Sequence, residues 1–401
     1  MPHPSRVRMT GSLAPYQDLI WTDLLARGYT RLSAKNLLRV AAHLSRWLES
    51  RGLSPRHLTA ARIDAFCRHR RDCGYVQWFS PRGLQGILRP LRAHNVVPAP
   101  EPAPKENSPL ARLLAEYECY LLEDRSVAST TACGYVRTAR RFFTEVGVDR
   151  LADIGCLTTA DISSFVVREA RTMATATAKL TVTGLRALLR YLHVRGLCAD
   201  LSAAVPAVAS HRLARLPKHI PWSEVQQLLN SCDRRTAVGR RDHAILLLLA
   251  RMGLRSVEVA SIELNDIDWA EGRVQVRSKG SQDWLPLPQD VGEALVRYLR
   301  RGRPSSQSRK LFLTSKAPYR DVSDGAVKMV VRAACRRAHL PPRSAHQLRH
   351  TAATQMLRSG ASLSEVAEVL RHRSLDTTAI YAKVDHLALR PLTRPWPGGA
   401  S

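Results

Sequence analysis

The first half of the chain carries a helical pattern that occurs twice. Amphipathic helices are predicted around residues 38–48 and 135–143, where apolar residues recur at helical spacing. Each is followed by two matched motifs, roughly 100 residues apart, the size of one small domain. Because order and spacing both match, we interpret them as a duplicated helical module with four or five helices per copy; chance similarity is the alternative. The motifs are LTAARIDAF (58–66) and GLQGILRPL (83–91), then LTTADISSF (157–165) and GLRALLRYL (184–192).

The last part of the chain has a different pattern. Helical spacing returns at 222–229 and 243–252, and two short runs, 273–278 and 283–288, then alternate in hydrophobicity. The runs flank a Lys-Gly-Ser-Gln turn, which is typical of a β-hairpin. The predicted fold is therefore mainly α, with duplicated helical modules followed by a mixed α+β domain that contains a small antiparallel sheet.

Proline-rich segments divide the chain. Residues 97–105 alternate proline with small residues, which indicates a stiff extended spacer, and 209–221 is basic and interrupted by prolines. The predicted parts are an N-terminal helical, DNA-binding-like module (1–96), a Pro-rich linker (97–107), a second helical module (108–200), a basic linker (201–220), the α+β domain (221–385) and a tail (386–401).

Charge points to a polyanionic partner. The 401 residues include 61 Lys plus Arg against 34 Asp plus Glu, a formal net charge of +27. An arginine-rich genome explains the choice of Arg over Lys but not the shortage of acids, so double-stranded DNA is the expected partner. A membrane partner is disfavoured, because the longest apolar run, 244–250, is far short of the roughly 20 residues that a bilayer needs. The N-terminus shows no apolar signal core, and we expect a cytoplasmic location.

Cysteine spacing disfavours zinc. The chain has eight cysteines and no Cys-x-x-Cys pair, so reduced, buried thiols are predicted. They are Cys67, Cys73, Cys119, Cys133, Cys156, Cys198, Cys232 and Cys335.

Two basic residues of the α+β domain are expected in turns. In ARMGLRSVEVASIEL (250–264), Gly253 is predicted to end one helix and Ser256 to cap the next, which holds Arg255 rigidly between them, as binding a phosphate demands. Lys279 lies at the hairpin tip, where its ammonium group can donate a proton. Ordinary surface positions are the alternative for both residues.

A third feature is the helix start in SAHQLRHTAATQML (344–357). Ser344 and Gln347 fit a capping box, and His346 and Arg349 share a face in the first turn, where backbone N–H groups favour an anion. This spacing predicts a phosphate site beside a proton-transfer residue; a basic surface turn is the alternative.

The fourth feature is RHRSLDTTAIYAKV (371–384), which contains His372 and Tyr381. Leu375, Thr378 and Tyr381 recur at i, i+3 and i+6, so this segment alone favours a packed core tyrosine. Upstream, Gly360 is predicted to end a helix, and Ser362 or Ser364 to start the next.

Taken together, these features resemble the catalytic domain of the tyrosine recombinase (phage integrase) family. The motifs GLRSVEV, SKGSQDWLPLP, HQLRHTAATQML and LRHRSLDTTAIYAKV occur in the family's order over roughly 221–384. The module at about 108–198 is similar to that family's SAM-like core-binding domain. The resemblance implies a clamp around a DNA duplex. It also implies a homo-tetramer on two duplexes, alone or with partner recombinases, at the nucleoid of a bacterium.

The resemblance also implies a reaction. A tyrosine phenolate keeps the phosphate bond energy by transesterification, and two arginines neutralise the charge on the phosphate oxygens. Tyr381 is thus assigned as the nucleophile that forms a 3′-phosphotyrosine link, and Arg255 and Arg349 as the phosphate clamp. No metal, nucleotide cofactor or external energy source is implied.

The remaining roles concern protons and orientation. By the same resemblance, Lys279 protonates the leaving 5′ oxygen, His346 handles the tyrosine proton, and His372 donates a hydrogen bond to the phosphate. Glu258, three residues after Arg255, is expected to orient the site or to be an ordinary helical acid.

Two departures from the family pattern are visible. Arg371 stands where the family usually has glycine before the histidine, which predicts an altered turn or an added phosphate contact. Residues 1–96 form a helical module where longer integrases often begin with a small sheet-containing arm-binding domain. The extra module favours a mobile-element enzyme for integration or transposition.

Three alternatives stay open. A type IB topoisomerase uses similar chemistry, although that family generally has lysine where His346 stands. A helix-turn-helix regulator accounts for GASLSEVAEVLRHRSLDTTAIY but leaves Arg255, Lys279 and the His346 pair as coincidence. An accessory protein that binds DNA without cutting is disfavoured by the intact residue set.

Overall fold

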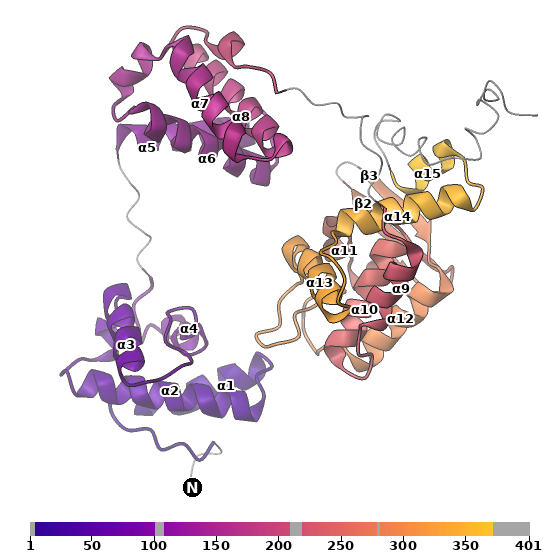
Figure 1. Ribbon diagram of the computed structural model, residues 1–401. Helices are drawn as coiled ribbons and strands as arrows, with labels where there is room; N and C mark the ends of the chain where they lie inside the picture. Colours follow the sequence, from indigo (N-terminus) through magenta and orange to yellow (C-terminus); the bar gives the residue numbers. More distant parts are fainter. Residues whose placement is uncertain (1–4, 101–107, 209–218, 279–280, 372–401) are drawn as a thin grey trace, which may run out of the picture. The chain divides into compact units, whose positions relative to one another are not determined.

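The computed structural model describes residues 5–100, 108–208, 219–278 and 281–371 (Figure 1). Separate hydrophobic cores lie in the N-terminal module, in the second helical module and in the C-terminal part of the chain. A small apolar cluster joins the last two described helices. None of the described helices is both long and apolar enough to cross a membrane.

Four α-helices build the N-terminal module around buried side chains that include Leu38 and Phe66. Thr30 caps the longest helix by accepting a hydrogen bond from the backbone of Ser33, and the apolar face of this helix is buried against the other three. The helices are α1 (Gln17–Ala26), α2 (Arg31–Glu49), α3 (Ala60–Asp72) and α4 (Gln85–Ala93), with 3₁₀ turns η1 (Ala14–Tyr16) and η2 (Pro55–His57).

The second helical module also has four α-helices. Its core contains Phe142 and Phe165, whose rings meet edge to face at 5.2 Å. The prediction of a mainly helical, duplicated architecture is confirmed. The helices are α5 (Pro109–Leu122), α6 (Ser129–Val146), α7 (Thr159–Thr172) and α8 (Thr175–Val194), with 3₁₀ turns η3 (Leu151–Cys156) and η4 (Ser202–Ala204).

The two modules differ before their last helix. In the second module the helix that carries GLRALLRYL starts at Thr175, two residues after Met173, the C-cap of α7. In the N-terminal module the helix that carries GLQGILRPL starts only at Gln85, and residues 73–84 form turns and bends instead. The first copy therefore exposes a stretch of chain that the second copy keeps helical.

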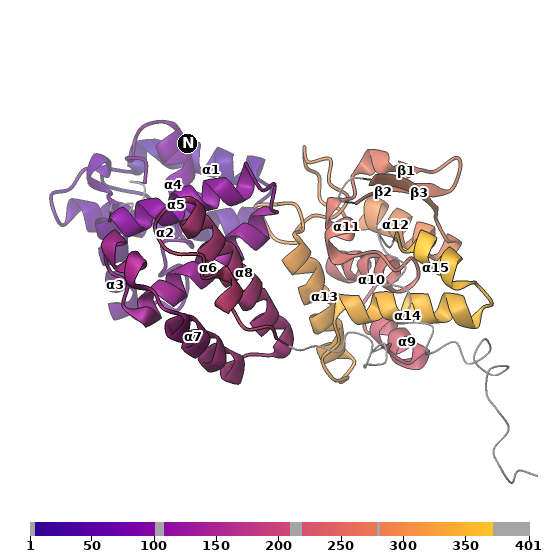
Figure 2. The same cartoon turned by 90° about the horizontal axis from the view of Figure 1, so that it is seen from above.

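In the C-terminal part, α10 forms the centre of the core. Seven consecutive residues of this helix, 244–250, are buried, because α9, α12, α13 and α14 pack around it (Figure 2). The predicted apolar helix is confirmed, although it begins earlier than expected. The helices are α9 (Trp222–Asn230), α10 (Ala237–Ala250), α11 (Ser256–Ser261), α12 (Gln289–Arg301), α13 (Asp324–Arg337), α14 (Ala345–Arg358) and α15 (Leu363–Val369).

The predicted antiparallel sheet is present and has three strands in the order β1-β2-β3. A short strand, β1 (Ile267–Asp268), follows the 3₁₀ turn η5 (Leu264–Asp266) and pairs with β2 (Arg273–Ser278). Strand β3 (Ser281–Pro286) starts two residues earlier than predicted and pairs with β2 from Ser278↔Ser281 onward. The hairpin connection is therefore shorter than the predicted four-residue turn.

All eight cysteines are free thiols, but the prediction that they are buried is only partly right. Cys67, Cys232 and Cys335 are buried, and Cys198 is half-buried. The other four lie on solvent-facing helix positions or at helix ends, where the small thiol side chain has no core to fill; these are Cys73, Cys119, Cys133 and Cys156.

Candidate active site

The site starts from the turn between α10 and α11. Gly253 has φ +62°, and a Cβ there would lie 2.6 Å from Leu370 Cδ2, so glycine allows this turn to pack closely against the end of α15. The Gly253 carbonyl accepts a hydrogen bond of 2.6 Å from Arg349 Nη1. The turn is thus tied directly to the helix that carries the second predicted arginine.

Arg255 itself caps α11. Its backbone N–H donates to Glu258 Oε2 at 2.7 Å, and its Nη1 donates to Glu258 Oε1, also at 2.7 Å. The prediction that Ser256 caps this helix is wrong: Ser256 is the first helical residue, because the Glu258 carboxylate reaches back to the Arg255 N–H. The Arg255 side chain is 36% exposed, so it is fixed by its neighbours yet open to solvent.

Arg349 is held from both sides of the site. Helix α14 begins with the predicted Ser344–Gln347 capping box, and Arg349 lies in its second turn with only 2% of its surface exposed. Besides Gly253, the guanidinium donates to the backbone carbonyl of Leu370 at the end of α15. An arginine with two backbone acceptors keeps its planar guanidinium in one orientation, as two-point recognition of a phosphate requires.

Two further contacts position α14. The backbone N–H of Ile220 donates to Thr351 Oγ1 at 2.8 Å, and this hydroxyl is 2.9 Å from the Gln347 carbonyl. Arg343, just before the helix, forms a bidentate ion pair with Glu224 of α9. Both contacts fix the first half of α14 against residues 220–224, the segment at which the described part of the C-terminal domain begins.

Glu258 is the centre of the arrangement. It is 1% exposed, and its carboxylate contacts Arg255 at 2.7 Å, Arg371 at 2.8 Å and Arg349 at 4.0 Å. We call these four residues the guanidinium cluster. Three guanidinium charges against one carboxylate leave a formal excess of two positive charges (three minus one), which suits a bound anion.

Arg371 occupies the position at which the family usually has glycine, and both its backbone and its side chain are part of the site. Its φ is +53°, the left-handed region in which glycine is favoured. The side chain, 6% exposed, donates to Glu258 Oε2, while the Arg371 carbonyl accepts a hydrogen bond from Arg255 Nη2 at 3.3 Å. The Arg371 side chain therefore binds Glu258 while its backbone adopts the left-handed conformation, and the predicted phosphate contact stays a prediction.

His346 lies in the first turn of α14 beside His350, with ring centroids 4.3 Å apart. Although the residue as a whole is exposed, partial desolvation of its ring by neighbouring atoms lowers the pKa of His346. The positive charges of Arg349 and Arg255 lower this pKa further. A lowered pKa keeps the imidazole neutral at pH 7, so its free electron pair is available to take up a proton.

The structure thus brings Arg255 and Arg349 together through Glu258 and places His346 under the influence of both. Lys279, His372 and Tyr381 lie outside the described residues; strands β2 and β3 flank the first of them, and α15 ends just before the second. Sequence reasoning missed that Arg371 is part of the cluster. The available signal was a charged residue at a position where glycine is usual.

Comparison with known proteins places the chain in a family. Residues 218–387 match the phage integrase family. A putative integrase/recombinase, y4rA of Sinorhizobium fredii, is 39% identical over 381 residues, which is 94% of this chain and 93% of that protein. The tyrosine recombinase XerC of Pseudomonas putida is 32% identical over 288 residues, 70% of this chain and 94% of that protein. The chain belongs to the tyrosine recombinase (phage integrase) family of site-specific DNA recombinases.

Solved structures agree on the fold. The XerH site-specific recombinase, in a post-cleavage complex with a difH substrate, matches with a TM-score of 0.54 at 19% identity, covering 82% of this chain and 93% of that one. A lambda integrase tetramer bound to a Holliday junction matches with a TM-score of 0.53 at 18% identity, covering 81% and 92%.

The left-handed backbone at residue 371 gives a first testable prediction. We expect Arg371→Gly to be more stable than Arg371→Ala by about 1 kcal/mol, because alanine bears the steric cost of positive φ and glycine does not. Urea unfolding of both variants measures the difference. At the exposed helical position Arg332 the order should reverse, with glycine about 1 kcal/mol less stable than alanine. An alanine variant at 371 as stable as the glycine variant would contradict the left-handed turn.

Proposed function

We propose that this protein cleaves and rejoins DNA strands at specific sites through a 3′-phosphotyrosine intermediate, for the integration or transposition of a mobile element. The observation that carries the proposal is the guanidinium cluster, with two excess positive charges held by a buried carboxylate. A phosphodiester passing through a five-coordinate state gathers negative charge on its non-bridging oxygens, and a preorganised pair of arginines stabilises that charge.

In this proposal each step of strand cleavage is carried out by a particular side chain. Tyr381 Oη attacks the phosphorus, the bond to the 5′ oxygen breaks, and one phosphodiester replaces another, so no energy source is required. Arg255 and Arg349 bind the non-bridging oxygens, and His372 donates a further hydrogen bond. The Tyr381 proton passes to neutral His346, and Lys279 supplies a proton to the leaving 5′ oxygen.

Glu258 and Arg371 have positioning roles in this proposal. Glu258 holds the Arg255 guanidinium and backbone at once, which sets the angle at which Arg255 meets the phosphate. Arg371 adds a third donor to the same carboxylate and offers its carbonyl to Arg255. It thereby links the segment that leads to His372 and Tyr381 with the arginine that binds the phosphate.

The wider assembly is part of the same proposal. We assign the core-binding role to residues 108–200, catalysis to 221–385, DNA contact to the basic linker 201–220, and subunit docking to the tail 386–401. The charge of +27 supports wrapping around DNA in the bacterial cytoplasm. A homo-tetramer on two duplexes is supported by the lambda integrase assembly of similar fold.

Covalent trapping tests the chemistry. Nicked suicide duplexes tiled across the ends of the DNA element that carries the gene are incubated with the protein, and the adduct is digested and sequenced by mass spectrometry. We expect an adduct on one tile, with the nucleotide linked to Tyr381. An adduct on another residue, or none on any tile, would contradict the proposal.

A topoisomerase is the second candidate, because it shares the covalent chemistry. Supercoiled plasmid without a recombination site separates the two. We expect negligible relaxation of this plasmid by a site-specific recombinase. Efficient relaxation, together with equal adduct on every tile, would establish the topoisomerase instead.

A further inference from the structure

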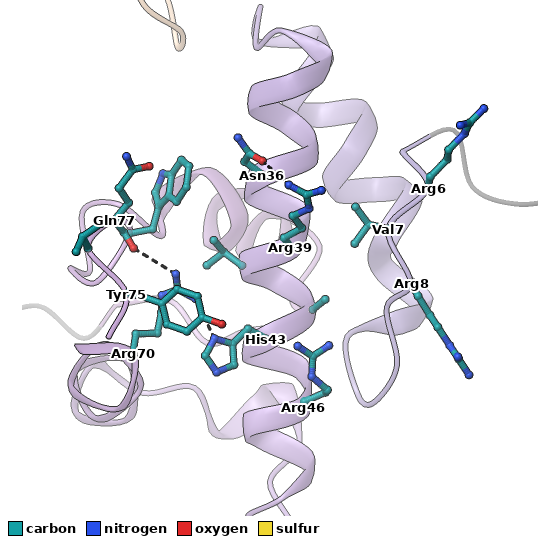
Figure 3. A pocket seen from close by; sticks show the side chains of 14 residues that line it. Arg6, Val7, Arg8, Asn36, Arg39, His43, Arg46, Arg70, Tyr75 and Gln77 are labelled. Carbon is teal, nitrogen blue, oxygen red and sulfur yellow. Dashed lines mark hydrogen bonds between the residues drawn. The ribbon is translucent and has the colours of Figure 1, made fainter. Parts of the chain in front are cut away.

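The N-terminal module carries a basic cleft, which lies outside the residues matched to the integrase family. It has a volume of about 580 Å³ and is bordered by the chain before α1, by α2, and by α3 with the turn after it (Figure 3). Within the described residues, no Asp or Glu lines the cleft. Five arginines do: Arg6, Arg8, Arg39, Arg46 and Arg70.

Helix α2 supplies one row of this cleft. Asn36, Arg39, His43 and Arg46 recur at intervals of three or four residues, so they share the face opposite the buried Leu38. Arg39 and Arg46 are exposed, as are Arg6 and Arg8 on the neighbouring segment. These four exposed arginines border one cavity without a lining acid, so their summed charge attracts an anion to it.

Arg70 is different, because it is buried and fixes the opposite wall. It is 3% exposed, its Nη1 lies 2.9 Å from His43 Nδ1, and its Nη2 donates to the Gln77 carbonyl at 3.2 Å. Its guanidinium lies 4.0 Å from the centre of the Tyr75 ring, and its Nε has no hydrogen-bond partner. Burial first, and Arg70 next, lower the pKa of His43 to about 4, so the ring is neutral and accepts from Arg70.

This wall is the stretch at which the two helical modules differ. Residues 73–84, which include Tyr75 and Gln77, form turns here, while the second module has an uninterrupted α8 from Thr175. The non-helical residues 75–78 line the cleft on the side opposite α2. Arg70 holds this segment in place through the Gln77 carbonyl and the Tyr75 ring. Arg70 is held by a neutral histidine and a backbone carbonyl, not by an acid. It therefore adds a positive charge to the cleft that no lining carboxylate compensates.

We propose that this cleft binds the phosphate backbone of double-stranded DNA, so that the N-terminal module is a DNA-binding part of the chain in addition to the catalytic domain. Arg39 and Arg46 are seven residues apart on α2, about 10 Å along the helix axis. Successive phosphates of one strand advance about 3.4 Å along the duplex, so the pair spans roughly three phosphates. A row of cations at this spacing fits a polyanion better than a single small anion. The choice of DNA as the polyanion rests on the proposed function.

Arg6, Arg8, Arg39 and Arg46 contact phosphates in this proposal, and Arg70 is a positioning residue. Contacts of this kind do not depend on base sequence, so they strengthen and orient binding without choosing the site.

The test compares two double variants of the full-length protein. Arg39→Gln with Arg46→Gln removes two charges from the cleft, and Arg56→Gln with Arg68→Gln removes two exposed charges from the same module outside it. Binding to a fluorescent 30-base-pair duplex of arbitrary sequence is titrated at several salt concentrations. We expect the cleft variant to bind ~10- to 100-fold more weakly near ~0.1 M salt, with a salt slope lower by about 1.8, or 0.9 per lost contact. The control keeps the wild-type slope.

Two outcomes would overturn the proposal. Equal salt slopes for the cleft variant and wild type would show that the cleft does not contact phosphates, and equal losses in both variants would show a general charge effect. Displacement of the duplex by ~10 mM inorganic phosphate at constant ionic strength would make the cleft a small-anion site instead; we expect no displacement. Covalent trapping tests the proposed chemistry separately. If the wild-type protein formed no adduct but the cleft variant still showed the reduced salt slope, the proposed chemistry would be contradicted and the cleft proposal would stand.

Discussion

Tyr381→Phe is expected to bind the recombination site as tightly as wild type, within about twofold, and to form no covalent adduct. The substitution removes one hydroxyl and keeps the aromatic ring and the charge of the chain, so DNA affinity from the basic surface is unchanged. Because the proposed nucleophile is lost, the strand-cleavage rate should fall by at least about 10⁴-fold. Denaturing gels of a nicked suicide duplex measure the adduct, and gel shifts measure binding.

Tyr319→Phe is the matched control. It removes the same hydroxyl from a partly exposed tyrosine outside the guanidinium cluster, and it should form wild-type amounts of adduct. Any adduct formed by Tyr381→Phe would show that another residue attacks the phosphate. A loss of DNA binding by this variant would instead show that the hydroxyl is needed for binding and not only for attack.

The second large effect is expected at Glu258. Glu258→Gln keeps the shape of the side chain but removes the charge that three guanidinium groups share, one of them on the almost fully buried Arg349. Breaking a buried ion pair by neutralising one partner costs about 3–5 kcal/mol. We expect a loss of unfolding free energy of this size and, because Arg255 loses its anchor, cleavage at least about 100-fold slower.

Glu263→Gln gives the comparison. Its carboxylate pairs with Lys310 and Arg277 but keeps a third of its surface exposed, so the same chemical change should destabilise the protein much less than Glu258→Gln. Chemical denaturation of both variants, followed by single-turnover cleavage, measures the two effects. Similar stability losses at positions 258 and 263 would contradict the central role of Glu258.

Local patterns predicted the helix boundaries best where a side chain marks them. The Ser344–Gln347 box starts α14 as predicted, and of the two serines predicted to start α15 it is Ser362 that does so, since such caps act within one turn of their own helix. The prediction failed at Ser256, where an arginine occupies the capping position and a glutamate supplies the cap. Alternation in hydrophobicity likewise identified the hairpin but not the first residue of β3, because pairing with β2 decides where a strand begins.

The site was predicted as a set of residue types and not as a geometry. Arg255 and Arg349 were expected to cooperate, and the structure does join them through one carboxylate. That the carboxylate also binds Arg371, 113 residues away in sequence, depends on a backbone turn that no local pattern marks. Long-range contacts of this kind come from packing of the whole domain, so residue spacing could not predict them.

The contact between Thr351 and Ile220 has a mechanical consequence. Ile220 lies at the point where the chain enters the catalytic body, and its N–H is bonded to a hydroxyl two residues beyond Arg349 on α14. Tension along the incoming chain is therefore delivered to the helix that holds the buried arginine. The Thr351 hydroxyl also donates back to the Ile220 carbonyl at 3.3 Å, so two hydrogen bonds couple the position of Ile220 to the helix that carries Arg349.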